Sequence, residues 1–317
     1  MSLSIVEHED EATESICTVE TEPIRRRLTA RRTLAVLPTL CTLGNCLCGF
    51  LVIFFASRNP EIAQMPWQWT PLTLAAVFVF VGMIFDGLDG QMARKTGRTS
   101  NWGAQLDSMA DMVTFGVAPA FLAVQLVGIK TPFVSESGDP LSDRVALVIA
   151  CIYVTCAALR LARFNIAADT EGPSAHMYFE GLPSPGAAGT VASLVLLHER
   201  FLANYSGELL NQTNPAGLAT PWPMQLSAIG MVLIMMLTAL AMVGRLQYVH
   251  VLNRYLRERA PIEYIAILMA IGLLVMVHVQ GALAAGLVAY ALSAPVSWIV
   301  KKIGFRGRGS GFRKGQP

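Results

Sequence analysis

Apolar stretches of about 20 residues recur along this 317-residue chain and limit the folds open to it. The longest, Tyr264–Val300, contains no Asp, Glu, Lys or Arg. A helix of about 20 apolar residues is long enough to cross the hydrocarbon core of a bilayer. Charged residues make up 15% of the chain, against about 25% in ordinary soluble domains. The sequence therefore predicts an all-α, multi-pass transmembrane helical bundle.

We expect about eight spans in this bundle. They are Leu34–Ala56, Pro71–Phe85 continuing to Arg94, Gln105–Gly128, Val145–Phe164, Gly181–Leu197, Pro223–Gly244 and two halves of Tyr264–Val300, separated by a turn near Gln280–Gly281. We expect four parts along the chain: a disordered acidic tail (1–24), a membrane domain (25–260), a transmembrane hairpin (261–301) and a basic cytoplasmic tail (302–317). The basic segment 25–32 either forms an interfacial helix or simply anchors the topology.

The basic residues orient the bundle. With eight spans and a cytoplasmic N-terminus, the outer segments hold four of the 24 basic residues: Arg58, Lys130, Arg144 and Arg200. This asymmetry satisfies the positive-inside rule. We therefore expect an integral membrane protein with its polar motif facing the cytoplasm.

That motif holds four carboxylates at the edge of apolar segments. Asp86 and Asp89 are three residues apart, and Asp107 and Asp111 are four apart, so each pair shares a helix face. Ionised Asp near a bilayer is costly unless it is compensated. Two such helices form a plausible four-Asp cage for hard divalent cations. Helix caps and surface salt bridges are the simpler alternative, but they do not require this spacing.

The complete pattern resembles the signature of the CDP-alcohol phosphatidyltransferases, an integral-membrane family. The pattern runs Asp86-x2-Asp89-Gly90-x2-Ala93-Arg94-x8-Gly103-x3-Asp107-x3-Asp111. The resemblance implies transfer of a phosphatidyl group from a CDP-linked lipid to the hydroxyl of a small alcohol, with release of CMP.

The resemblance also implies roles for these residues. The four Asp would hold two cations, Mg²⁺ or Mn²⁺, and Asp111 would also serve as the catalytic base. Nucleotide and CDP-lipid binding would involve six further residues: Gly90, Ala93, Arg94, Gly103, Thr42 and Asn45.

Other segments resemble the bacterial phosphatidylserine synthases of this family. They are Leu37–Gly49, Phe115–Ala120, Leu159–Asn165 and Phe179–Pro185. This branch implies CDP-diacylglycerol and L-serine as substrates, membrane lipid as surroundings, a homodimer and no nucleic-acid partner. Arg160, Arg163 and Asn165 would bind serine, although the two arginines could instead be membrane-edge anchors.

Two alternatives stay open. In the first, the acceptor is glycerol 3-phosphate, inositol or inositol phosphate. In the second, the chain is a cation-coupled transporter that uses intramembrane carboxylates. A transporter favours pseudo-repeated, discontinuous helices, whereas the Asp cluster occurs once and no repeat is visible.

Overall fold

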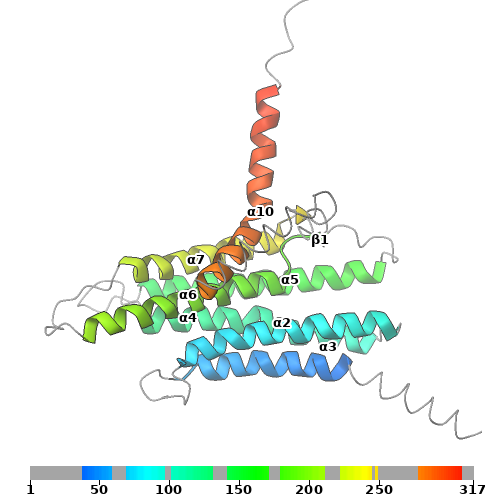
Figure 1. Cartoon of the computed structure of the whole chain (residues 1–317). Helices are drawn as coiled ribbons and strands as arrows, with labels where there is room; N and C mark the ends of the chain where they lie inside the picture. The colour runs from blue at the N-terminus through cyan, green and yellow to red at the C-terminus, as the bar shows by residue number, and fades with distance from the viewer. Residues whose placement is uncertain are drawn as a thin grey trace, which may run out of the picture.

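The computed structural model describes residues 38–58, 69–96, 101–130, 141–170, 179–210, 222–244, 247–248 and 278–308. Helices account for nearly all of these residues and lie side by side in a bundle (Figure 1). The helices are Pro38–Ala56, α2 (Pro71–Thr96), α3 (Asn101–Asp111), α4 (Ala118–Lys130), α5 (Leu141–Thr170), α6 (Ser184–Leu210), α7 (Trp222–Val243) and α10 (Val279–Arg308). The predicted all-α class is confirmed.

Two short features interrupt this pattern. A π-helical segment, Met112–Val117, joins α3 to α4, so that the two form one continuous helix. Strand β1 (Phe179–Glu180) pairs antiparallel with β2 (Gln247–Tyr248) beside the start of α6.

Five described helices are long and apolar enough to cross a membrane, as expected for a multi-pass protein. They are Pro38–Ala56, Pro71–Met92, Trp102–Val127, Arg144–Ile166 and Val279–Trp298. The expected span Gly181–Leu197 falls on α6, which is not among the five, and α7 contributes the shorter apolar helix Ile229–Val243. The count of eight spans therefore stays a prediction.

One expected boundary is wrong. The turn predicted near Gln280–Gly281 does not occur there, because both residues lie in the first turn of α10. The backbone N–H of Ala282 donates to the carbonyl of His278 at 2.9 Å, which closes that turn. Gln280 and Gly281 are both tolerated in the first turn of a helix, so this pair does not break it. The acidic tail, the segment 25–32 and the first half of the hairpin lie outside the described residues.

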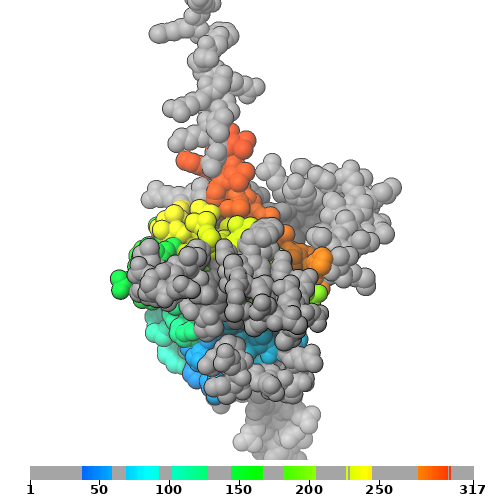
Figure 2. Space-filling model, turned by 90° about the vertical axis from the view of Figure 1, so that its left-hand side faces the viewer, coloured from blue at the N-terminus to red at the C-terminus, as the bar shows by residue number. Residues whose placement is uncertain are grey.

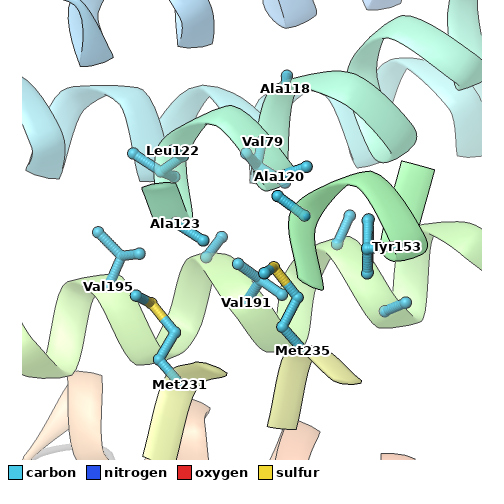
Figure 3. Packing of buried hydrophobic residues seen from close by; sticks show 14 of the residues in the cluster. Val79, Ala118, Ala120, Leu122, Ala123, Tyr153, Val191, Val195, Met231 and Met235 are labelled. Carbon is cyan, nitrogen blue, oxygen red and sulfur yellow. The ribbon is translucent and has the colours of Figure 1, made fainter. Parts of the chain in front are cut away.

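Helix α6 is the centre of the bundle, with contacts to α2, α4, α7 and α10. Its side chains Val191 and Val195 meet Met231 and Met235 of α7 in the core (Figure 3). Small buried residues such as Ala187 let neighbouring helix backbones approach closely. Such close packing stabilises helix contacts in lipid, where the hydrophobic effect does not drive helices together. The Pro38–Ala56 helix and α10 lie at opposite sides of the bundle (Figures 1 and 2).

The entry to α6 is fixed by a glycine. Gly181 has a φ of +87°, in the left-handed region that favours glycine. A Cβ at this position would lie 2.6 Å from the carbonyl oxygen of Met242, so the chain also passes very close to the end of α7. The N–H of Leu182 donates to the carbonyl of Ala241 at 3.0 Å. Together these contacts place Ser184, the first residue of α6.

Candidate active site

Three carboxylates gather where α2 and α3 meet. One oxygen from each of Asp86, Asp89 and Asp107 lies within 4.8 Å of the others. The i, i+3 spacing on α2 turns the first two toward the same neighbour, as expected. Asp107 Oδ1 is buried and has no hydrogen-bond partner among the described residues.

The chemistry of this donor set fits a hard divalent cation. Three anionic groups this close repel one another unless positive charge compensates them. Carboxylate oxygens are the ligands that Mg²⁺ and Mn²⁺ prefer. The unpartnered oxygen of Asp107 leaves an acceptor available for such an ion. Three of the four carboxylates of the predicted cage therefore lie together, and the role of Asp111 as a ligand stays a prediction.

Asp111 lies one turn beyond Asp107 and has a different partner. Asn45 of the Pro38–Ala56 helix donates from Nδ2 to Asp111 Oδ1 at 2.9 Å. On the same helix, Thr42 Oγ1 donates to Asp89 Oδ2 at 3.2 Å. Both donors are buried. The structure thus places Thr42 and Asn45 against the carboxylates, while their contact with a nucleotide stays a prediction.

A close crossing of helices holds Asn45 in place. The hydroxyl of Thr114, in the π-helical segment, donates to the backbone carbonyl of Asn45 at 2.8 Å. A Cβ on Gly49 would lie 2.7 Å from Thr114 Oγ1, and a Cβ on Gly82 would lie 2.6 Å from Thr114 Cγ2. The two glycines therefore allow the Pro38–Ala56 helix and α2 to touch the segment that follows Asp111.

Arg160 of α5 lies near this cluster. Its guanidinium interacts electrostatically with Asp86 and Asp111. Nη1 donates to the hydroxyl of Ser184 at 2.7 Å, and the serine is almost completely buried. Nε is buried and has no hydrogen-bond partner among the described residues. The arginine is thus held at one nitrogen and keeps donor capacity at another.

Arg163 and Asn165 occupy other surroundings. Arg163 is exposed and donates from Nη1 to the carbonyl of Val243, at the end of α7, at 3.2 Å. Asn165 Oδ1 accepts a hydrogen bond from Ser108 at 3.1 Å. Arg160 and Arg163 thus have different hydrogen-bond partners, and their shared role in binding serine stays a prediction.

The remaining predicted nucleotide ligands lie around the end of α2. Gly90 is exposed, and a Cβ there would meet nothing within 4 Å. Gly103 lies in the first turn of α3. Ala93 and Arg94 belong to the last turn of α2, but their side chains lie outside the described part of the structure.

Sequence reasoning missed four residues that support the site: Ser108, Thr114, Ser184 and Tyr290. Ser184 belongs to the segment Phe179–Pro185, which carried the resemblance to the family without a role for the hydroxyl. Ser108 and Thr114 lie beside the Asp motif, where their hydrogen bonds depend on helix packing. Tyr290 is far along the chain, and no local pattern links it to Arg160.

Comparison with known proteins gives a consistent assignment. The family model of the CDP-alcohol phosphatidyltransferases matches residues 35–213, more than half of the chain. A Helicobacter pylori protein named CDP-diacylglycerol–serine O-phosphatidyltransferase is 34% identical over 168 residues, 53% of this chain and 60% of the relative. Proteins of the same name from Bacillus subtilis and Methanocaldococcus jannaschii are 34% and 39% identical over 166 and 126 residues.

The match to the Bacillus protein covers 52% of this chain and 78% of that protein. The match to the Methanocaldococcus protein covers 40% of this chain and 52% of that protein. The chain therefore spans 60% of the length of the Helicobacter relative and about half of the Methanocaldococcus one. The matched region contains the carboxylate cluster, Asn45, Arg160 and Ser184. By this match and by its Asp motif, the chain belongs to the CDP-alcohol phosphatidyltransferase family.

Proposed function

We propose that this protein transfers the phosphatidyl group from CDP-diacylglycerol to the hydroxyl of L-serine, giving phosphatidylserine and CMP. The observation that carries the proposal is the cluster of Asp86, Asp89 and Asp107 inside a chain of this family. The printed names of the relatives support serine as the acceptor.

Asp86, Asp89 and Asp107 would hold divalent cations, with Asp111 as a further ligand. We propose that two ions bind, either Mg²⁺ or Mn²⁺, as the family resemblance of the Asp motif implies. When bound, they would neutralise the pyrophosphate of CDP-diacylglycerol and stabilise the negative charge on the departing CMP. Gly90, Ala93, Arg94 and Gly103 would border the nucleotide, and the open surface above Gly90 is compatible with its approach.

The reaction replaces a phosphoanhydride bond by a phosphate ester bond. The serine hydroxyl oxygen forms a bond to the phosphorus that carries diacylglycerol, and the bond from this phosphorus to the oxygen of CMP breaks. The hydroxyl proton passes to Asp111 as general base. The N–H that Asn45 donates to Oδ1 keeps that oxygen an acceptor and aims the carboxylate, which leaves Oδ2 to take the proton.

Arg160 would recognise the carboxylate of serine. Its Nη1 is held by Ser184, while its Nε lacks a partner among the described residues. An arginine offers a planar set of donors that suits a carboxylate. Arg163 turns away to the end of α7, so these two arginines do not form the paired basic site that a phosphorylated acceptor favours. This arrangement supports serine over glycerol 3-phosphate or inositol phosphate. In this proposal Asn165, which already contacts Ser108, adds a hydrogen bond to the acceptor.

The location follows from the same reasoning. The five apolar helices make this an integral membrane protein. We propose the bacterial cytoplasmic membrane, with the carboxylates facing the cytoplasm, where nucleotides are available. A homodimer is also proposed, from the family resemblance.

A direct assay tests the function. Purified protein is given CDP-diacylglycerol, Mg²⁺ and, separately, labelled serine, glycerol 3-phosphate, inositol or inositol phosphate, and the lipid products are separated. We expect phosphatidylserine with release of an equal amount of CMP. A product with another acceptor alone would replace serine, and ion flux across vesicles without any lipid product would favour a transporter.

A further inference from the structure

The C-terminal helix α10 lies outside the region that the family model matches, yet it packs directly on α6. Thr190 of α6 donates from its hydroxyl to the carbonyl of Leu287 at 3.3 Å. A Cβ on Gly189 would lie 3.6 Å from Leu287 Cδ1. Glycine on α6 thus brings α10 close to the half of the helix that begins at Ser184.

Tyr290 of α10 lies against the first turn of α6. A Cβ on Gly186 would lie 3.1 Å from Tyr290 Cε1, so the aromatic ring rests on the first turn of α6. Ser184, two residues earlier in that turn, accepts the hydrogen bond from Arg160 Nη1. The phenol of Tyr290 is also close enough to Arg160 for the charge of the guanidinium to act on it. Three elements, α5, α6 and α10, therefore converge on one side chain.

We propose that Ser184 and Tyr290 are positioning residues that hold Arg160 toward the acceptor, and that α10 forms part of the acceptor site. This inference rests on the proposed function, in which Arg160 binds the serine carboxylate. An arginine side chain is long and loses much rotamer freedom when it is fixed. Neighbours that fix it before the substrate arrives reduce the entropy lost on binding.

The proposal predicts a selective effect on the acceptor. Ser184 and Tyr290 position the guanidinium and do not touch the substrate in this proposal, so their loss passes on only part of a hydrogen bond to a charged group, about 3- to 10-fold in affinity. Tyr290→Phe keeps the ring against Gly186 and removes the hydroxyl. Ser184→Ala removes the acceptor of the 2.7 Å hydrogen bond. We expect each variant to raise the KM for serine about 3- to 10-fold, with the KM for CDP-diacylglycerol unchanged.

The test compares these variants with Val296→Ala, a change at an exposed position of α10. KM and kcat are measured for both substrates, and thermal unfolding is followed in detergent. Ser184→Thr, which keeps a hydroxyl, should restore the serine KM. A serine KM for Tyr290→Phe within twofold of the wild-type value would overturn the proposal. An equal rise in both KM values would also overturn it, because it would indicate a general structural effect.

The two proposals fail in different ways. A wild-type protein that forms no phosphatidylserine contradicts the proposed function. A wild-type protein that forms phosphatidylserine, with Tyr290→Phe and Ser184→Ala kinetically unchanged, contradicts only the positioning role of these two residues.

Discussion

Replacement of Asn45 by Ala would show whether this side chain binds the nucleotide or orients Asp111. The family resemblance assigns Asn45 to the nucleotide, whereas the structure pairs its Nδ2 with Asp111 Oδ1 at 2.9 Å. Asn45 is fully buried, so water does not readily replace the lost donor. A hydrogen bond to a charged group contributes about 1.5–3 kcal/mol. If this bond aims the base during proton transfer, kcat should fall about 10- to 150-fold.

The assay measures steady-state turnover of CDP-diacylglycerol and serine, with Ser57→Ala as the control. This control removes an exposed 2.9 Å hydrogen bond to the carbonyl of Phe54, just beyond the other end of the same helix, and touches no carboxylate. We expect Asn45→Ala to lower kcat with the KM for CDP-diacylglycerol within about threefold of its wild-type value. A raised KM for CDP-diacylglycerol at normal kcat would refute this reasoning and assign Asn45 to the nucleotide.

Three further predictions concern the carboxylates and the arginines. Asp107→Asn should abolish turnover in a protein that still folds in detergent. EDTA should abolish the turnover of the wild-type protein until Mg²⁺ or Mn²⁺ is added. Full activity after thorough chelation would contradict the cation site. Asp111→Asn should bind CDP-diacylglycerol, measured by equilibrium binding, but turn over very slowly, and near-normal turnover would assign the base to another group. Arg160→Lys should lower kcat/KM for serine about 30- to 1,000-fold, whereas Arg163→Lys, at an exposed position of α5, should change it less than about threefold; equal effects would show that the two arginines share a role.

The sequence predicted much of the fold because apolar length and Asp spacing are local properties. The all-α membrane class follows from the long apolar segments, and α2 ends at Thr96, two residues beyond the expected Arg94. The i, i+3 pair on α2 correctly indicated that Asp86 and Asp89 lie near Asp107. These features require only helical geometry and the cost of charge in lipid.

The supporting contacts could not be predicted in the same way. The position of Ser184 depends on the positive φ of Gly181 and on a two-residue strand pair with Gln247–Tyr248, and neither has a periodic pattern. The different directions of Arg160 and Arg163 depend on which helix lies beside each of them. Tertiary packing decides these contacts, so single-sequence spacing carries no signal for them.

The π-helical segment Met112–Val117 has a consequence for changes in chain length. Each residue of an α-helix advances the side chains by about 100° around the axis, and a π-helical turn accommodates one residue more than an α-helical turn. The helix from Asn101 to Lys130 therefore carries two rotational registers, one for Asp107 and Asp111 and one for the buried stripe of α4. Deletion of one residue within this segment would remove the extra residue and make the helix regular, with Asp107 and Asp111 still directed toward Asp86 and the apolar stripe still in the core. The same deletion in a regular α-helical stretch would rotate the two sides of the helix by about 100° relative to each other.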